Sequence, residues 1–271
     1  MKLRIATYNI HKGVTSLGQR PRIHTLKRAL RSLSADVIFL QEVQGRHDLL
    51  AIRLDSPLLT VAQHEFLAGK TFHCAYGMNA EYDHGHHGNA LLSCLPIIYS
   101  ENQDVSDHAL ESRGILHCVI QSEDVNVHCF VVHLGLFSGS RKRQTQALIA
   151  QVKKSAPPDA PVIIAGDFND WSNQLSETLR KNLAVCEVFD EKYTEPSITN
   201  YLRRLIGRSP VKSSARTFPA SMPWLRMDRI YVRGFHVESA KVLLGERWSR
   251  LSDHAPIVAT LALKPRRTNK A

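Results

Sequence analysis

The sequence predicts an α/β fold in which one large domain is built around two sheets. Segments with the two-residue alternation of β-strands are interspersed with segments that place apolar residues at helical spacing. The chain has 271 residues, of which 43% are hydrophobic and 22% are charged, as in ordinary globular proteins. No internal repeat or linker divides it. We therefore expect a single catalytic domain over residues 1–264 and a basic tail at residues 265–271.

The first part of the chain is predicted to pair two strands with helices. LRIATYNI, residues 3–10, alternates as a strand does, and residues 21–34 have the helical spacing of a segment that covers it. VIFLQEV, residues 37–43, is apolar until its last polar residues and indicates a buried strand that ends in a polar site. Residues 47–69 are expected to be helical with a break at Pro57.

The next part is predicted to be mainly strands. Residues 71–77 and 89–99 are strand candidates on either side of a polar loop, EYDHGHHG, at residues 81–88. ILHCVIQ, residues 115–121, and NVHCFVVHL, residues 126–134, surround a short polar turn and have the pattern of a β-hairpin.

A helix, a strand and a second helix are predicted to follow. Residues 141–154 have an amphipathic helical pattern, with Ser138 or Ser140 as the expected N-cap. PVIIAGDFN, residues 161–169, is read as a strand that ends in an acidic group, and a helix is expected over about residues 173–182.

The last part combines an irregular segment with closing strands. Residues 193–223 are rich in Thr, Ser, Pro and Arg and are expected to form a long loop beside the substrate, with a short helix at residues 201–206. MDRIYV, VESAKVLL and APIVATLAL, at residues 227–232, 237–244 and 255–263, are predicted as three further strands.

Cysteine usage and the N-terminus indicate the compartment. The five cysteines form no CxxC pair and lie mostly in apolar runs, so we interpret them as reduced core residues. The N-terminal sequence lacks the apolar core of a signal peptide, and no apolar run is long enough to span a membrane. These features predict a cytoplasmic protein without a transmembrane segment.

The formal net charge is +10, from 35 basic and 25 acidic residues. Such an excess favours polyanionic partners, either nucleic acid or an anionic phospholipid surface. No protein partner can be inferred from it.

Polar residues end four of the predicted apolar strands. Carboxylates are costly at such positions unless a counter-ion or a cation compensates them. An oxygen-rich group of this kind suits Mg²⁺, and two nearby histidines, His133 and His254, could exchange a proton or hold phosphoryl oxygens. The strand ends carry Asn9, Glu42, Asp167 with Asn169, and Asp253 with His254.

Six segments in order resemble the motif series of the endonuclease/exonuclease/phosphatase superfamily: TYNIHKG, LQEV, VVHLGL, GDFN, MDRIYV and SDHAPI. The resemblance covers nearly the whole chain. It implies a DNase I-like fold, a four-layer α/β/β/α sandwich with two packed mixed β-sheets, and Mg²⁺-dependent hydrolysis of phosphoesters. The chain lacks a GxSxG elbow and a Walker-type loop, which argues against serine hydrolases and P-loop NTPases.

The resemblance also implies a metal site. Glu42 corresponds to the principal Mg²⁺ ligand, with Asn9 beside it and Asp253 as a further ligand or the partner of a ligand. Mn²⁺ is the expected substitute for Mg²⁺.

Catalytic roles follow from the same resemblance. Asp167 and Asn169 would position the attacking water and the scissile phosphate. His254, oriented by Asp228, is similar to the general base, for which Asp167 is a rival. His133 resembles the histidine that hydrogen-bonds the phosphate.

Two residues are candidates for substrate binding. Asn89 is placed where the family often has a polar partner for the site histidine. Arg143 belongs to a basic run, Arg141 to Arg143, that could meet substrate phosphates at a helix N-terminus or form a solvated helical turn. The glycine-spaced histidines of residues 84–87 are interpreted as a flexible rim, and not as a zinc site.

Three functions are compatible with the sequence. VVHLGL stands where the AP-endonuclease branch has a YxPN segment, so a histidine-bearing branch is favoured. Positive charge makes a nuclease the first hypothesis, with basic residues of the long loop, Arg203 to Arg216, near the substrate. A phospholipid or phosphoinositide phosphodiesterase or phosphatase is the alternative and would need an exposed apolar loop, for which SMPWL, residues 221–225, is the candidate. A non-catalytic polyanion-binding protein would require a broken site.

Two tryptophans have competing interpretations. Trp171 and Trp224 could stack bases, but packing in the core is the favoured reading of both.

Overall fold

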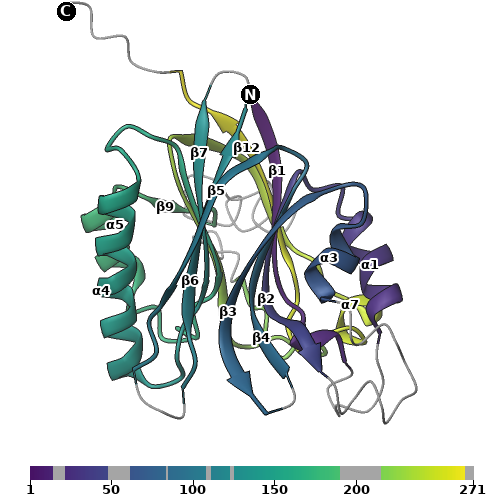
Figure 1. Ribbon diagram of the computed structural model, residues 1–271. Coiled ribbons are helices and arrows are strands. Elements are labelled where there is room, and N and C mark those ends of the chain that lie inside the picture. Colours follow the sequence, from purple (N-terminus) through teal and green to yellow (C-terminus); the bar gives the residue numbers. More distant parts are fainter. Residues whose placement is uncertain are drawn as a thin grey trace, which may run out of the picture.

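Two six-stranded sheets pack face to face in the computed structural model (Figure 1). The structure describes residues 1–14, 22–47, 62–83, 85–107, 111–122, 125–189 and 215–265, with residues 46 and 47 described by their backbone alone. Strands from the two ends of the chain meet in one sheet, because residues 2–7 pair with residues 257–262.

The first sheet has the strand order β11-β12-β1-β2-β4-β3. It is mixed, since β1 and β2 are parallel while the other neighbouring strands are antiparallel. Its strands are β1 (Lys2–Asn9), β2 (Val37–His47), β3 (His73–Tyr82), β4 (Gly85–Ser93), β11 (Phe235–Val242) and β12 (Ile257–Leu263).

The second sheet has the strand order β5-β6-β7-β8-β10-β9. Here β7 and β8 are the parallel pair. Its strands are β5 (Ile97–Asp104), β6 (Gly114–Gln121), β7 (Asn126–His133), β8 (Val162–Asp167), β9 (Cys186–Glu187) and β10 (Asp228–Arg233).

Helices cover the outer face of each sheet, as Figure 1 shows. On one side lie α1 (Ile23–Arg31), α3 (Gln63–Ala68) and α7 (Glu246–Ser249), and on the other α4 (Ser138–Ser155) and α5 (Ser176–Leu183). A short 3-10 turn, η1 (His11–Gly13), follows β1. The expected four-layer α/β/β/α sandwich with two mixed sheets is confirmed.

Alternation along the strands explains the layers. In β1, Ile5 packs between the two sheets, whereas Ala6 and Tyr8 pack in a separate core beneath α1. The same alternation puts Ile230 of β10 between the sheets and Tyr231 beneath α4 and α5. Strands buried on both faces must be apolar almost throughout, so a polar residue at the end of such a strand indicates a functional site.

The segment from residue 81 to residue 99 differs from the prediction. Residues 81–88 are not a loop but mostly the paired ends of β3 and β4, with Tyr82 opposite Gly85. Their side chains are polar because the tip of the hairpin faces solvent, so composition concealed the pairing. Residues 89–99 are not one strand either, since the chain leaves β4 before Pro96 and begins β5 in the other sheet.

Smaller differences concern caps, cysteines and short elements. No side-chain hydrogen bond caps α4, and Ser140 Oγ instead donates to Asp107 at 2.8 Å. All five cysteines are free, but Cys74 and Cys94 are exposed, so these two are not core residues. The short elements β9 and α7 were not expected.

Some predictions lie outside the described residues. These are most of the helix over residues 47–69, the short helix at residues 201–206, most of the loop over residues 193–223, and nearly all of the tail. Among the described residues, no helix is long and apolar enough to cross a membrane.

Candidate active site

The polar strand ends meet at one edge of the two packed sheets. In the second sheet, the strand register places Asp167 beside His133 on β7 and opposite Asp228 on β10. Asn9, which ends β1 in the first sheet, donates from Nδ2 to Asp167 Oδ2 over 3.2 Å. The site therefore joins the two sheets.

Gly166 explains how Asp167 comes so close to β7. The glycine has a φ of 152°, and a Cβ atom there would lie 1.9 Å from the carbonyl oxygen of Val132. A larger residue would separate β8 from β7 directly before the aspartate. The glycine of the GDFN motif thus keeps Asp167 beside His133.

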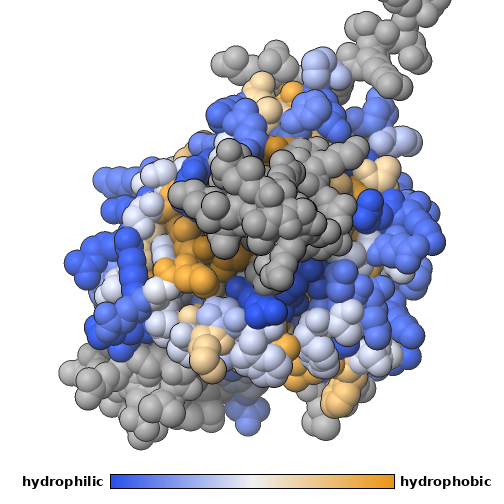
Figure 2. All heavy atoms as spheres, turned by 180° about the vertical axis from the view of Figure 1, so that it is seen from behind, coloured by the Kyte–Doolittle hydropathy of each residue, from blue (hydrophilic) through white to orange (hydrophobic). Residues whose placement is uncertain are grey.

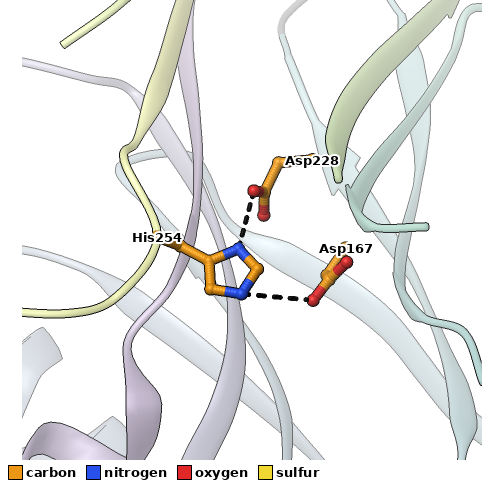
Figure 3. A group of neighbouring side chains, drawn as sticks. All are labelled: Asp167, Asp228 and His254. Atoms are coloured by element: carbon orange, nitrogen blue, oxygen red, sulfur yellow. Dashed lines mark hydrogen bonds and ion pairs between the residues drawn. The ribbon is translucent and has the colours of Figure 1, made fainter. Parts of the chain in front are cut away.

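His254 lies between two buried aspartates (Figure 3). Its Nδ1 donates to Asp228 Oδ2 at 2.8 Å, and its Nε2 is 3.7 Å from Asp167 Oδ2. Burial lowers the pKa of His254, but the charges of Asp228 and Asp167 outweigh it and raise the pKa to about 10. At neutral pH His254 is therefore an imidazolium ion held by Asp228.

Asp167 is a buried carboxylate of weakened acidity. Burial raises its pKa to about 6, against the opposing charge of His254. The backbone N–H of Asn169 donates to its Oδ1 at 2.9 Å, and Asn169 Nδ2 donates to the carbonyl of Leu134 at 2.9 Å. These bonds fix the carboxylate, which is ionised above pH 6 and can then accept a proton.

His133 differs from His254 in charge. Its Nε2 is 3.6 Å from Asp167 Oδ2. Burial, followed by the charge of Arg113, lowers the pKa of His133 well below the usual value, so its imidazole is neutral. A neutral imidazole can hydrogen-bond a phosphoryl oxygen without adding a charge to the site.

Further side chains with oxygen atoms lie beside Asp167, and Asn9 connects them to it. Asn9 Nδ2 also donates to Glu42 Oε1 at 3.2 Å. Glu42 has a φ of 53° at the irregularity where β2 departs from its register with β4, and this bulge directs its side chain. Ser252 Oγ donates to the carbonyl of Asn9 at 2.7 Å, which fastens the segment that carries Asp253 to the end of β1.

His11 shows that this second group fits a cation. Its Nδ1 lies 3.3 Å from Asp253 Oδ1 and 3.9 Å from Glu42 Oε2. A protonated His11 offsets the charge of both carboxylates, and the hydrogen bond to Asp253 favours that form by raising the pKa of His11. A divalent cation could do the same, and two carboxylates with an amide oxygen are ligands that Mg²⁺ prefers. The residues present therefore fit a divalent metal ion.

Asp167, Asp228 and His254 also have side chains of the kind that bind metal ions. Asp167, Asp228 and His254 offer ligand atoms within 4.8 Å of one another. Because the Nδ1 proton of His254 is already held by Asp228 and its ring is cationic, these three form an ion-paired group for handling protons.

The two predicted substrate contacts lie in different surroundings. Asn89 is fully buried on β4, and its Nδ2 donates to the carbonyl of Gly114 at 2.9 Å. Its Oδ1 has no hydrogen-bond partner among the described residues. Arg143 is exposed on α4 and forms a two-point ion pair with Asp107. Arg143 therefore occupies a solvated turn of α4, where it pairs with Asp107.

Two further histidines, His11 and His87, were not predicted as site residues. His11 lies in the TYNIHKG motif, two residues after Asn9, and that proximity was the available signal. His87 belongs to the segment interpreted as a flexible rim, yet burial and then the charge of Lys12 lower its pKa to about 4, against the charge of Glu42. In the sheet His87 pairs with Gln44 of β2, and its Nδ1 has no hydrogen-bond partner in the described part of the chain.

The two tryptophans are not core residues. Trp171 and Trp224 are both exposed, so the favoured reading of packing in the core was wrong for each.

Comparison with known proteins identifies the family of the chain. The sequence model of the endonuclease/exonuclease/phosphatase family matches residues 6–254. A protein of Escherichia coli strain K12, described as uncharacterized protein YbhP, is 38% identical over 263 residues, which are 96% of each chain.

Two solved structures have the same fold. An endonuclease/exonuclease/phosphatase from Beutenbergia cavernae has a TM-score of 0.69 and 18% identity, over 97% of this chain and 72% of the other. A mannosyl-6-phosphatase from Bacteroides thetaiotaomicron has a TM-score of 0.67 and 17% identity, over 96% of this chain and all of the other.

Proposed function

The chain belongs to the endonuclease/exonuclease/phosphatase family, and from this premise we propose that it is a Mg²⁺-dependent phosphodiester hydrolase. Members of the family are phosphoester hydrolases. The observation that supports Mg²⁺-dependent hydrolysis of a diester is that Asp167 lies beside two histidines, one cationic and one neutral, and next to a separate group of side chains with oxygen atoms. Such a site can activate water and hold an anionic ester at the same time.

The residues suited to the metal ion are Asn9, Glu42 and Asp253. When bound there, Mg²⁺, or Mn²⁺ in its place, would offset the charge of phosphoryl oxygens and acidify a bound water. The surrounding protein groups supply the remaining chemistry.

The order of pKa values favours Asp167 as the proton acceptor. With a pKa of about 6 it is ionised at neutral pH, whereas His254, with a pKa of about 10, already carries its proton. Asp167 takes the proton from the attacking water, and Asn169 keeps the carboxylate in place through its backbone N–H. The resemblance favoured His254 as the base and left Asp167 as its rival, and this proposal exchanges the two.

The two histidines then bind the phosphoryl group. The imidazolium of His254, held by Asp228, stabilises the negative charge that grows on the phosphoryl oxygens. Neutral His133 hydrogen-bonds a further oxygen, while buried Asn89 of β4 donates to the carbonyls of Gly114 and Val131. No covalent nucleophile is needed.

Two substrate classes are candidates. Nucleic acid is favoured by the net charge of +10, and Arg216 is the exposed basic residue of the long loop that the described residues include. Anionic phospholipid is favoured by a specific observation, because Met222 and Trp224 of the SMPWL segment are exposed. A non-catalytic polyanion-binding role is disfavoured, since the catalytic side chains are present and in contact. A cytoplasmic location stays a prediction.

A hydrolysis panel tests the proposal. It contains bis-p-nitrophenyl phosphate, p-nitrophenyl phosphate, single- and double-stranded DNA, RNA and phospholipid vesicles, each with Mg²⁺ and with EDTA. Wild type is compared with Glu42→Ala and His254→Ala, and with Glu177→Ala as a matched change of an exposed carboxylate outside the site.

We expect wild type and Glu177→Ala to cleave a diester only with the metal, and both site variants to lose at least about 10²-fold in rate. Equal activity of the site variants and wild type would refute the site. Faster hydrolysis of the monoester than of the diester would refute the proposal that the substrate is a phosphodiester.

A further inference from the structure

Large apolar side chains lie exposed around the catalytic site. Five of them occur in three segments that adjoin site residues: after β7, after β8 and before β10. We call them the apolar rim. They are Leu136, Phe137, Trp171, Met222 and Trp224, and each is between 47% and 74% exposed.

One side of the apolar rim is anchored to His254. The ring of Phe218 lies 5.0 Å from the His254 ring, centre to centre. The backbone N–H of Ala220 donates to the carbonyl of Asp253 at 2.6 Å, and Leu225 donates to the carbonyl of Phe218 at 2.9 Å. This closed turn is therefore fixed at its base by the site, while Met222 and Trp224 between its ends face solvent.

The other side is anchored near His133 and Asp167. Arg141 is buried, donates to the carbonyl of Leu136 and lies over the ring of Trp171, 4.7 Å from its centre. It thereby holds the segment after β7 against the segment after β8. Leu136, Phe137 and Trp171 form one exposed apolar group within four residues of His133 or Asp167 along the chain.

The chemistry of the apolar rim restricts its partner. Exposed apolar groups of this size around a functional site usually mark a binding surface. Seen from behind, hydrophobic patches lie among hydrophilic residues at the lower end of the molecule, toward which β1 and β2 run (Figure 2). The partner must therefore offer apolar surface and phosphoesters side by side.

Nucleic acid satisfies this condition only in part. Bases can stack on Trp171 and Trp224, but Leu136 and Met222 have no ring to stack. A bilayer of anionic phospholipid offers acyl chains to all five side chains, an interfacial position suited to tryptophan, and negative charge for a chain of net charge +10.

We propose that the apolar rim docks on an anionic phospholipid bilayer, so that the ester hydrolysed at the site belongs to a phospholipid headgroup. This inference rests on the proposed function, which supplies the hydrolysis, while docking itself needs only the rim. The phosphoester then enters the site from the plane of the membrane, between the two anchored sides of the rim.

Vesicle flotation tests the docking without depending on turnover. The full chain is mixed with vesicles of phosphatidylcholine, with or without phosphatidylglycerol, and wild type is compared with Met222→Ser/Trp224→Ser. The matched control is Ile98→Ser/Tyr99→Ser, which changes two side chains of 48% exposure on β5. The β5 register places them near the start of β7, far along the strands from His133.

We expect wild type and the control to float with phosphatidylglycerol vesicles, and the rim variant to lose roughly 10- to 100-fold in partition, as for two large apolar groups that leave the bilayer. Circular dichroism checks that each variant is folded, and Met222→Ser alone should give a smaller loss. Equal flotation of the rim variant and wild type would overturn the docking.

Two further results separate the inference from the proposed function. If wild type cleaves bis-p-nitrophenyl phosphate but does not float with vesicles, the docking is wrong and the hydrolase stands. If it floats yet cleaves no diester, the proposed function is wrong, and so is the lipid as substrate. If only DNA affinity, measured by fluorescence anisotropy, falls in the rim variant, the rim stacks bases and the lipid proposal is refuted.

Discussion

Replacing Asp228 by asparagine tests the proposed roles of Asp167 and His254. The amide keeps the size of the side chain and an oxygen for the Nδ1–H of His254, now 2.8 Å away, but removes the negative charge. Apart from burial, which opposes it, that charge is the largest influence on the pKa of His254, and it raises the pKa. The variant therefore changes how firmly the site holds its imidazolium ion.

The size of the effect follows from the pKa of about 10 in wild type. Loss of one adjacent opposite charge typically changes a pKa by about 1–3 units, which would place the pKa of His254 in the variant near 8. At pH 7 both proteins then carry the imidazolium. At pH 9 wild type still carries it, whereas the variant keeps it in roughly a tenth of the molecules, so the activity ratio of wild type to variant should be about tenfold larger than at pH 7.

The assay is kcat/KM for bis-p-nitrophenyl phosphate at saturating Mg²⁺, from about pH 5 to pH 9.5, with Asp159→Asn as an exposed control. Asp167 must be ionised, so activity should rise through its pKa of about 6 in wild type and the control, and at lower pH in Asp228→Asn, because the charge of Asp228 raises the pKa of Asp167. His254 must be protonated, so activity should fall on the alkaline side, and earlier in Asp228→Asn. A wild-type rate that stays low at pH 7 and rises only toward pH 10 would make His254 the base and refute the scheme.

Three further predictions concern metal binding and stability. Glu42→Gln should weaken Mg²⁺ or Mn²⁺ affinity at least about tenfold in calorimetric titration, because the ligand loses its charge; unchanged affinity would remove Glu42 from the metal site. His11→Ala should destabilise the metal-free chain by up to about 1 kcal/mol, and saturating metal should abolish the difference in melting temperature, since the cation replaces the imidazolium; a difference that persists with metal would contradict this. His117→Gln should make the fold less sensitive to acid. Burial, and then the charge of His128, lowers the pKa of His117 to about 4, so the neutral ring stabilises the fold fully above pH 6.5. This contribution to the free energy of unfolding, at most roughly 3 kcal/mol, is lost as pH falls toward 4. Urea unfolding at pH 5 and pH 7 measures it, and equal acid losses in both proteins would refute it.

The strand ends could be predicted because burial leaves few options. Asn9, Glu42 and Asp167 follow apolar runs that can only be core strands, and a polar residue in such a place needs a partner. The structure brings them together, with Asn9 in contact with both carboxylates. Register adds what the pattern lacked, since it alone sets Asp228 opposite Asp167.

Other features depended on contacts between distant segments. The direction of the Glu42 side chain and the position of His87 opposite Gln44 both follow from the irregular pairing of β2 with β4. No local sequence pattern encodes this pairing. The polar hairpin tip had the composition of a loop, although it is paired. Trp171 and Trp224 have the size of core residues, and their exposure follows from where the turns before β10 and after β8 are anchored.

Arg229 shows why activity alone cannot assign roles at this edge. It is fully buried beside Asp228, and because successive strand residues point to opposite faces it lies on the helix side, away from His254. Its guanidinium donates to the carbonyl of Asp170 at 2.6 Å and pairs with Glu187 at 3.2 Å, while Asp170 accepts the backbone N–H of Leu175 at 2.9 Å. Removal of one partner from a buried pair costs about 3–5 kcal/mol. A substitution of Arg229 would therefore loosen the segment that follows Asp167 and lower activity although the guanidinium touches no catalytic group, and only the pH profile, which should keep its shape, distinguishes it from a change of Asp228 one residue earlier.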